Sequence, residues 1–385
     1  MSDFPTLAQV LSVMDGRYPP SSAESWDAVG LVCGEPQAVV RRVLFAVDPV
    51  QAVADEAVTR SADLLITHHP LLLRPVHAVA ATTAKGRLLS GLIRAETALF
   101  VAHTNADSAS PGVSDALANL LGLRDLVPLQ AGAVDPLDKL VTFVPTGDAE
   151  QVIDALAAAG AGAIGNYQRC AWTAPGTGTF LPVSGARPAI GRLGEVESVA
   201  EVRVEMVLRR ALRAAVVRTL REAHPYEEPA FDLFELASLP GPLGLGRVGR
   251  LPAALPLSEF AALAAARLPR TAAALRVAGD LGRAISTVAV CGGAGDSLLS
   301  AAAAAGADAF LTADLRHHPA SEHLESGGPA LVDASHWATE WPWLSQAATL
   351  LQQDLAAIGT TVEVMVSSIV TDPWTAPASP DGPAA

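Results

Sequence analysis

The chain has 385 residues, of which half are hydrophobic, 17% are charged and 5% are aromatic, and its formal net charge is -14 at pH 7. This length and apolar content predict a compact protein of two or three domains and exclude a chain that is disordered throughout. The acidic balance argues against a nucleic-acid partner, because an acidic protein gains nothing from neutralising phosphate groups.

Cysteine usage and the lack of long apolar runs predict a cytoplasmic protein with no membrane span. Cys33, Cys170 and Cys291 are isolated, and an odd number of cysteines is a poor disulfide framework, so a reducing compartment is expected. The first residues show no basic region followed by an apolar core, which argues against a signal peptide. No apolar run reaches the roughly 20 residues that a membrane-spanning helix needs.

The early part of the chain shows strands that alternate with helices. Leu7, Val10, Leu11 and Met14 follow the period of an apolar helical face. The predicted elements are, in order, a helix at 5–14, a strand at 42–47, a helix capped by Asp48, a strand at 64–67, a helix at 86–94 and a strand at 97–102. This alternation is typical of a largely parallel, buried sheet.

A similar layout returns late in the chain. The predicted elements are a strand at 286–290, a glycine-rich turn at 291–296, a helix at 297–305 and strands at 307–312 and 329–333. The segment 307–312 echoes the segment 61–67, and a double histidine follows each. We therefore expect two related α/β halves whose strand ends supply ligands, with chance similarity in alanine-rich sequence as the alternative.

Residues 131–245 have a different character. The predicted elements are a strand at 139–146, a helix at 148–159, strands at 167–174 and 201–208, a helix at 209–222 and a strand at 229–236. This βαββαβ order is typical of a ferredoxin-like α+β domain. Glycine and proline predict loops or linkers at 175–194 and 239–249.

These patterns predict an α/β protein with an inserted domain. The expected parts are a discontinuous α/β metal-binding lobe at 1–130 and 246–370, an inserted domain at 131–245 and a flexible tail at 371–385.

Three histidines and two carboxylates are the candidate metal ligands. His68 and His69 end an apolar strand and precede a proline that blocks a helical continuation, so both imidazoles can turn toward one point. His336 and Glu340 are four residues apart and would share one face of a helix. Asp107 would add a carboxylate for bridging and charge compensation.

Each candidate also has an ordinary structural explanation. The adjacent histidines could bond to the backbone, and Asp107 could cap the helix that begins near Gly112. His336 and Glu340 could be a surface pair. The three tryptophans that follow His336 argue against a solvated helix, because indoles normally seek burial.

Together these side chains predict a dinuclear site. Nitrogen and oxygen ligands without a thiolate suit zinc first, with manganese, iron, cobalt or nickel as alternatives. Two such cations activate a bound water and hold a phosphoryl or carbonyl oxygen. The turn at 292–295 could bind an anion or only form a tight turn, since it lacks the ending of a Walker A loop. His317 and His318 are left outside the predicted ligand set.

Several motifs together resemble the Nif-three-like family, whose bacterial members carry the label GTP cyclohydrolase 1 type 2 homologue. The matching stretches lie in family order over nearly the whole chain, at 25–31, 66–70, 103–107, 292–295, the strand ending at Thr312, and 333–336 with Glu340. The resemblance implies that the dinuclear ligands are His68, His69, Asp107, His336 and Glu340.

The segment 224–229 resembles the domain that longer bacterial members insert, which is similar to the P-II and CutA trimeric folds. The resemblance also implies a toroidal homohexamer with metal sites that open onto its cavity. Two positions depart from the family pattern. Asp27-Ala28 replaces Asp-Asn, so any role of that amide is lost. Thr312-Ala313-Asp314 replaces Thr-Gly-Glu, which leaves Asp314 as a candidate general base on a shorter side chain.

Two functions are compatible with the sequence. One is a metal-dependent hydrolase acting on a phosphate-bearing or nucleotide-like small molecule. The other is a non-enzymatic metal-binding regulator or adaptor that assembles through the inserted domain. The sequence identifies neither the substrate nor a protein partner, and it contains no pterin or guanine recognition motif.

Overall fold

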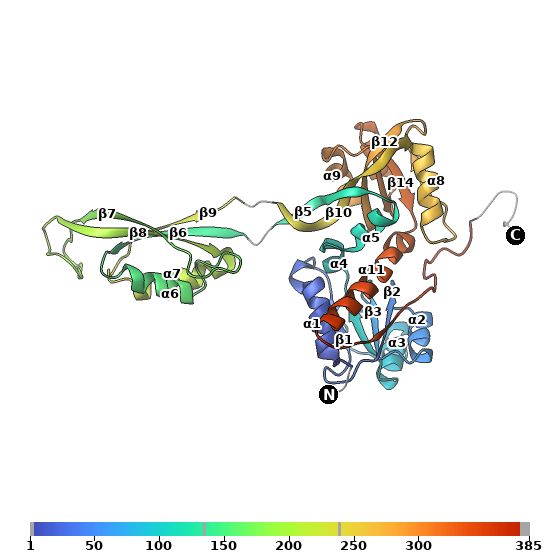
Figure 1. Cartoon of the computed structure of the whole chain (residues 1–385), viewed down its shortest axis with the longest axis horizontal. Helices are drawn as coiled ribbons and strands as arrows, with labels where there is room; N and C mark the ends of the chain where they lie inside the picture. Colours follow the sequence, from blue (N-terminus) through green and yellow to red (C-terminus); the bar gives the residue numbers. More distant parts are fainter. Residues whose placement is uncertain (1–3, 134–135, 238–239, 378–385) are drawn as a thin grey trace. The chain divides into compact units, whose positions relative to one another are not determined.

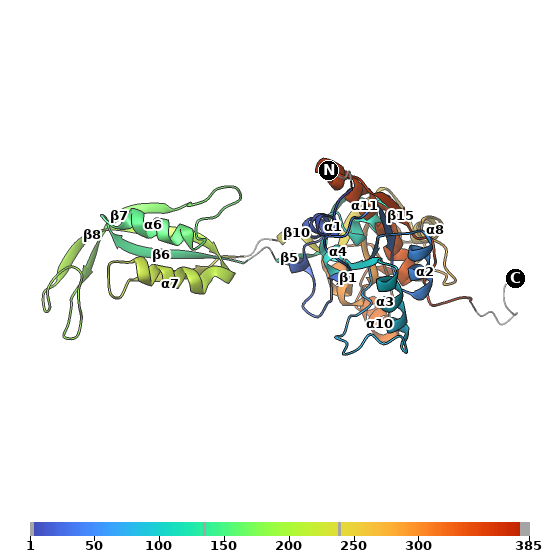
Figure 2. The ribbon, with the colours of Figure 1, turned by 90° about the horizontal axis from the view of Figure 1, so that it is seen from below.

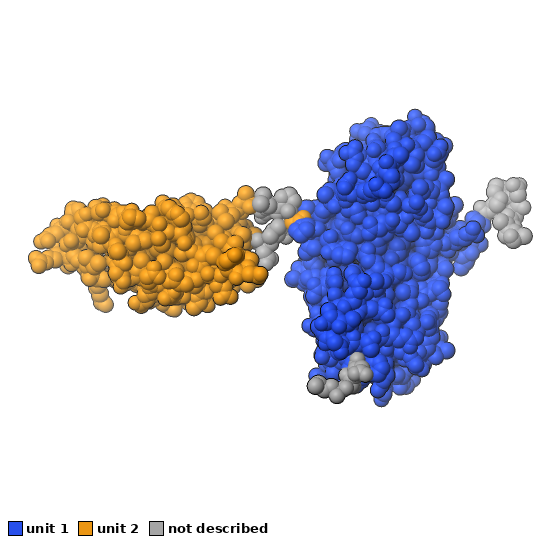
Figure 3. Space-filling model, in the orientation of Figure 1, with its two compact units in different colours: residues 1–132, 242–385 blue, residues 133–241 orange. Residues whose placement is uncertain are grey.

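The computed structural model describes residues 4–133, 136–237 and 240–377 of the 385-residue chain. The chain forms two compact units, which Figure 3 draws in different colours. Unit 1 comprises residues 1–132 and 242–385, and unit 2 comprises residues 133–241. None of the helices in the described ranges combines the length and apolar character that crossing a membrane requires.

The first sheet of unit 1 has the strand order β1-β4-β3-β2-β15 (Figure 1). Its strands are β1 (Gly30–Cys33), β2 (Arg42–Ala46), β3 (Leu64–Thr67), β4 (Ala98–Val101) and β15 (Glu363–Val366). β15, β2, β3 and β4 are parallel, and β1 is antiparallel to β4. The parallel pairing predicted for the early strands is therefore present.

Helices cover both faces of this sheet. They are α1 (Leu7–Arg17), α2 (Gln51–Thr59), α3 (Ala84–Arg94) and α11 (His336–Ala357). α1 and α11 share one core with Phe45 and Ile66. α2 and α3 share another core with Leu44 and Leu65, which point to the opposite face because successive strand residues alternate. This double cover explains why β3 is buried along its whole length.

The second sheet of unit 1 has the order β11-β14-β13-β12-β10-β5. Its strands are β5 (Arg124–Ala133), β10 (Pro240–Pro256), β11 (Arg276–Ala278), β12 (Ala284–Ala294), β13 (Ala309–Ala313) and β14 (Ala330–Ala334). β12, β13 and β14 are parallel neighbours. α5 (Val113–Leu120) and α8 (Leu257–Arg267) cover one face, and α9 (Leu299–Ala304) and α10 (His317–Glu325) cover the other.

Helix α11 connects the two sheets of unit 1, between which it runs in Figure 1. It contacts β2 and β15 of the first sheet and β12 and β13 of the second. Trp343 is fully buried and packs its ring edge-on against Tyr18 and Phe45. The predicted burial of tryptophans in this helix is therefore correct for Trp337 and Trp343, and the first turns of α11 are held against both sheets.

Unit 2 is an antiparallel sheet with two helices on one face. Its elements are β6 (Leu137–Pro145), α6 (Ala149–Ala158), β7 (Trp172–Phe180), β8 (Glu197–Arg209), α7 (Arg213–Ala223) and β9 (Phe231–Glu235). The strand order is β7-β8-β6-β9. Figures 1 and 2 show α6 and α7 on the same side of the sheet, where they share a core with Val144 and Val204.

Three predictions based on glycine and proline are wrong over part of their ranges, although residues 181–194 form neither helix nor strand, as predicted. The predicted loop at 175–194 begins inside β7, which starts later than the predicted strand at 167–174. The described part of the predicted linker at 239–249 belongs to β10, while Leu239 lies outside the described residues. β12 continues to Ala294 through most of the predicted turn at 291–296.

Glycine and proline are tolerated in these strands because of where the strands lie in their sheets. β7 is an edge strand, where a proline is tolerated because only one side of the strand must donate hydrogen bonds. Gly249 lets β10 approach β5 closely, since a Cβ there would lie 2.6 Å from the Leu126 side chain. Short 3-10 turns occur at Pro20–Ser22, Arg210–Leu212 and Asp296–Leu298, and one further helix, α4, spans Thr104–Ser108.

Candidate metal centre

His68 and His69 leave the carboxyl end of β3 at the edge of the first sheet. Their backbone amides donate to the carbonyls of Ala46 (3.1 Å) and Val47 (2.9 Å), which extends the pairing with β2 beyond the last strand residue. Thr67 Oγ1 donates to the His69 carbonyl at 2.9 Å. With the backbone held in this way, the two rings lie 5.1 Å apart between centroids and both border the same site.

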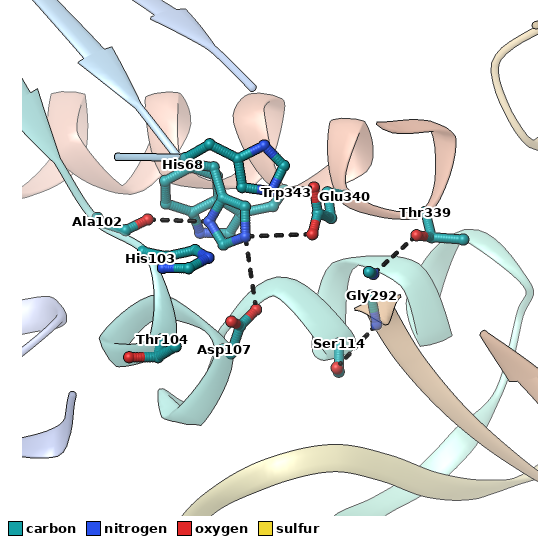
Figure 4. A network of polar contacts seen from close by, with 12 residues as sticks. His68, Ala102, His103, Thr104, Asp107, Ser114, Gly292, Thr339, Glu340 and Trp343 are labelled. Atoms are coloured by element: carbon teal, nitrogen blue, oxygen red, sulfur yellow. Dashed lines mark hydrogen bonds and ion pairs between the residues drawn. The ribbon is translucent and has the colours of Figure 1, made fainter. Parts of the chain in front are cut away.

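His68 is completely buried and has a defined tautomer. Its Nδ1 lies 2.9 Å from the carbonyl oxygen of Ala102, and because a carbonyl only accepts, Nδ1 must carry the proton. Nε2 is then the acceptor. It lies 3.4 Å from Glu340 Oε1 and 3.7 Å from Asp107 Oδ1. Dashed lines mark both contacts in Figure 4.

Three further histidines repeat this arrangement with carboxylates in place of the carbonyl. The Nδ1 atoms of His69, His103 and His336 donate to Asp48 (2.7 Å), Asp27 (2.9 Å) and Asp314 (2.6 Å) respectively. Each carboxylate orients its ring and leaves Nε2 free to act as a ligand, which is how histidines are commonly held at metal sites.

Glu340 supplies the carboxylate at the centre. Ser335 caps the start of α11 by accepting from the Ala338 amide, so His336 and Glu340 lie one turn apart on one helical face, as predicted. Glu340 Oε1 is 2.9 Å from His336 Nε2, and Oε2 is 3.1 Å from His69 Nε2. Only 3% of Glu340 is exposed.

Several acceptors at this centre lack donors. His68 Nε2 and Glu340 Oε2 are buried without a hydrogen-bond partner among the described residues. His69 Nε2 and His336 Nε2 face each other at 3.3 Å. Buried acceptors without donors are unfavourable, and a divalent cation would satisfy all of them. The residues present therefore fit a metal ion well.

Asp107 lies in α4, close to His68. The alternative prediction that it caps the helix near Gly112 is wrong, because Asp115 accepts from the Gly112 amide at 2.7 Å and performs that role for α5. Burial raises the pKa of the Asp107 carboxyl to about 6, and the neighbouring Glu340 adds to this effect.

The charges around Glu340 are strongly coupled. Burial opposes ionisation of Glu340, but the imidazoles of His69, His68 and His336 overcome it and hold the pKa of the carboxyl well below its usual range. Burial likewise lowers the pKa of His336, and Glu340 reverses this effect and raises it to about 9. Burial together with His68 lowers the pKa of His103 to about 4. His103 is therefore the neutral imidazole of the group near pH 7.

The structure corrects the predicted role of Asp48. It does not cap α2, whose N-terminal cap is Val50. Asp48 instead accepts from His69 through Oδ1 and from the Thr371 hydroxyl through Oδ2. Ser335 donates to Asp372 in the same segment. The predicted disorder at 371–385 is thus wrong for residues 371 and 372, and residues 378–385 lie outside the described residues.

The glycines at 292–295 allow close packing against neighbouring residues. Gly293 has a positive φ of 67°, and a Cβ at this position would overlap Glu340 Oε1 and lie 3.0 Å from His336 Nε2. Its amide donates to Thr339 Oγ1 at 2.9 Å, and the Gly292 amide donates to Ser114 Oγ at 3.4 Å. Because these donors are occupied, the possible anion site at 292–295 receives no support.

Of the five predicted ligands, His68, His69, His336 and Glu340 are linked by short contacts, whereas Asp107 approaches His68 at 3.7 Å and belongs to neither close set. Two sets have ligand atoms within 4.8 Å of one another, namely His68 with His69 and His103, and His69 with His336 and Glu340. His103 was absent from the predicted ligands. A carboxylate within two residues of the end of a neighbouring parallel strand, as at Asp48 and Asp314, is the feature that could have indicated the supporting groups.

A cavity of about 690 Å³ borders the metal centre. His69 and His336 form part of its wall together with Asp314, which orients His336. The indole of Trp374 and the side chain of Arg276 also line it. The centre is therefore reachable by a small molecule.

Nearly the whole chain is similar to known proteins. The profile of the Duf34/NIF3 (NGG1p interacting factor 3) family matches residues 5–373. The "GTP cyclohydrolase 1 type 2 homolog" of Mycobacterium tuberculosis is 54% identical over 373 residues, which cover 96% of each chain. The protein of the same name from Streptomyces coelicolor is 41% identical and covers 97% of this chain and 94% of the relative.

Solved structures show the same fold. A Bacillus cereus protein related to NIF3 has a TM-score of 0.71 at 34% identity and covers 97% of this chain and 99% of that chain. Staphylococcus aureus protein SA1388 has a TM-score of 0.80 at 27% identity with the same coverage. The mixed α/β architecture with several sheets is shared with these structures.

Proposed function

Because the chain belongs to the Duf34/NIF3 family, we propose that it is a metal-dependent hydrolase of a small phosphate-bearing or nucleotide-like molecule. The proposed ligands of two divalent cations are His68, His69, Asp107, His336 and Glu340. Zinc is the first choice for this donor set, and manganese, iron, cobalt and nickel are alternatives. When bound, such a pair supplies an activated water and holds an anionic oxygen.

The observation that carries this proposal is the set of unpaired acceptors at one buried point. His68 Nε2 and Glu340 Oε2 lack donors, and the Nε2 atoms of His69 and His336 are 3.3 Å apart. Without metal, protons can satisfy some of these atoms, because Glu340 overcomes the effect of burial and raises the pKa of His336 to about 9. Divalent cations satisfy them together.

Glu340 would hold metal from the centre of the site, since its carboxylate approaches three imidazoles. Its Oε1 is near the Nε2 atoms of His336 (2.9 Å) and His68 (3.4 Å), whereas Oε2 is near that of His69 (3.1 Å). Asp107 approaches His68 and would balance the charge of the second cation. His103, whose Nε2 is neutral and unprotonated near pH 7, is a further candidate for holding a cation or a water.

The adjoining cavity supports a substrate with a planar ring, to which Trp374 and Trp337 offer aromatic surface. The guanidinium of Arg276 is already paired with Asp333, so the proposed cations would hold the anionic group. Asp314 accepts from His336 at 2.6 Å, so we propose that it orients this ligand, which replaces the earlier hypothesis of a general base.

The proposal is tested by metal analysis and turnover on the full-length protein. Protein purified without chelator or polyhistidine tag should contain close to two metal ions per chain, and it should hydrolyse activated phosphoesters or nucleotides after metal is restored. His68→Ala and Glu340→Ala should lose both properties while remaining folded by circular dichroism. His317→Ala is the matched control, since His317 lies in α10 outside the centre.

Unchanged turnover in both ligand variants would refute the hydrolase. Metal binding without turnover over a broad substrate panel would instead support a non-enzymatic regulator or adaptor. The observation that favours this alternative is the exposed aromatic surface of unit 2, where Trp172 is 57% and Phe234 is 51% exposed. Such surface is suited to assembly with another chain.

We further propose that unit 2 is the inserted ferredoxin-like domain and that it organises a homohexamer. Its strand order β7-β8-β6-β9 with both helices on one face supports this assignment. The unpaired state of Cys33, Cys170 and Cys291 supports a cytoplasmic location. Light scattering of the purified protein would test the hexamer.

A further inference from the structure

Unit 2 contains a cavity of about 690 Å³ that shares no residue with the metal centre. It lies on the face of the sheet that points away from α6 and α7. Phe143, Glu201 and Arg203 line it, whereas the strand neighbours Val144 and Val204 point into the core beneath the helices.

The walls of the cavity are mainly aromatic and aliphatic. Phe180 and Tyr226 meet edge-to-face with ring centroids 5.6 Å apart, and Ile190 lies in the segment that closes another side. This segment is held in place because the Arg187 amide donates to Glu227 Oε2 at 2.9 Å. The cavity is therefore formed within one copy of unit 2.

A buried carboxylate lies at the floor. Glu201 is only 8% exposed, and its Oε1 accepts from the Tyr226 hydroxyl at 2.8 Å. No donor among the described residues reaches Oε2. Burial, with Glu201 as a further cause, raises the pKa of Tyr226, which keeps the phenol protonated as the donor. One oxygen of a largely buried carboxylate is thus left for a ligand.

Two glycines of β7 leave space in front of this carboxylate. A Cβ at Gly178 would overlap Glu201 Oε2, so the carboxylate lies directly over this glycine. A Cβ at Gly176 would meet nothing within 4 Å and would project into open space. Both glycines are on the same face of the strand, because they are two residues apart.

The charge of the lining is negative. Glu201, Glu227 and Glu228 are opposed by Arg203 alone. Arg203 is already engaged, since its Nε donates to Glu205 at 2.9 Å and its guanidinium lies 5.9 Å from the centroid of the Phe143 ring. An anion would therefore meet net repulsion in this cavity.

We propose that this cavity binds a small organic cation, namely a primary ammonium or guanidinium group attached to an aromatic or apolar body. The cationic nitrogen donates to Glu201 Oε2 and lies against the rings of Phe180 and Tyr226, where both the carboxylate and the π faces attract positive charge. The body fills the space in front of Gly176. This site goes beyond the proposed hydrolase and does not depend on it.

The test is calorimetric titration of the full-length protein with tryptamine, which carries an ammonium group on an indole. Indole-3-propionate, with a carboxylate in place of the amine, and the neutral tryptophol are the matched probes. We expect tryptamine to bind and indole-3-propionate not to bind. Glu201→Gln should weaken tryptamine at least roughly tenfold, because it removes the charge and keeps the shape.

Gly176→Val distinguishes the cavity from unspecific binding. A Cβ at this position meets nothing within 4 Å and valine suits a strand, so we expect the fold to be kept, while the side chain takes up space beside Glu201 and tryptamine binding is lost. Equal binding of tryptamine and tryptophol, or unchanged binding to Gly176→Val, would overturn the proposal. So would a change of oligomeric state in Gly176→Val, because it would show that another copy of the chain occupies this face.

Discussion

Glu340 of unit 1 and Glu201 of unit 2 are both buried carboxylates, and they lie in opposite surroundings. Three imidazoles approach Glu340 through Nε2, and the direction of each ring is set by an acceptor behind Nδ1. Glu201 instead accepts from one phenol and lies in a cavity lined by aromatic rings. Directed lone pairs require a small, highly charged ion, whereas a single carboxylate among rings suits a diffuse organic charge.

Removing the negative charge of each carboxylate in turn should distinguish the two sites most clearly. Glu340→Gln removes the negative charge of a proposed ligand. It should therefore lower zinc affinity by more than the roughly 100-fold that loss of an outer hydrogen bond can cause. Glu201→Gln should leave zinc affinity unchanged. Competition with a fluorescent chelator measures both values. Equal zinc affinity in Glu340→Gln and the unaltered protein would contradict the assignment of the metal centre.

The carboxylates that accept from the imidazole Nδ1 atoms should have the next largest effect on zinc affinity. Asp48→Ala removes the acceptor of His69 Nδ1 and the contact with Thr371, so the ring loses its fixed direction. We expect zinc affinity to fall roughly 10- to 100-fold. Asp55→Ala, an exposed aspartate in α2, is the control. If both variants bind zinc like the unaltered protein, the ring is oriented by packing and not by Asp48.

Protons should compete with metal at unit 1. Without metal, His336 has a pKa of about 9, so below that pH a proton occupies the Nε2 atom that a cation needs. Zinc affinity should therefore fall about tenfold per pH unit below pH 9 for each proton released. Asp107, with a pKa of about 6, adds a second proton below that value. Calorimetry in buffers of different ionisation enthalpy counts the protons, and zero release would refute this prediction.

In the metal-free protein the proton on His336 stabilises the folded state. The folded pKa of His336 is raised from 6.5 to about 9, so its contribution to stability is complete below pH 6.5 and is lost as the pH rises through 9. Unfolding by urea in the presence of a chelator should show this decline. Stability that stays constant over this range would contradict it.

The smallest effects should come from the glycines beside each carboxylate. Gly293→Ala places a side chain at positive φ against Glu340 and should cost about 1–2 kcal/mol of unfolding free energy from the backbone alone. Gly178→Ala has ordinary strand geometry and displaces only the end of Glu201, so its cost should be smaller while tryptamine binding falls. Calorimetric unfolding compares the two. A larger loss in Gly178→Ala would reverse this order.

Much of the fold could be predicted because its determinants are local. The apolar strands β2, β3 and β4 and the helices between them are found close to their predicted positions, and the i, i+4 spacing of His336 and Glu340 placed them on one helical face. Predictions that rested on glycine and proline alone did less well. β7 and β10 are strands despite these residues, because an edge position and close approach to a neighbour make them acceptable there.

The sequence by itself determined which side chains could bind a metal and which strands would end beside them. Only the tertiary structure decided that Asp48, Asp27 and Asp314 lie behind the imidazoles, and that Glu201 lies at the floor of an open cavity beside the glycines of β7. The reason is physical. Strand and helix periods are properties of neighbouring residues, whereas the partner of a ring nitrogen or a carboxylate depends on segments far along the chain that packing alone brings together.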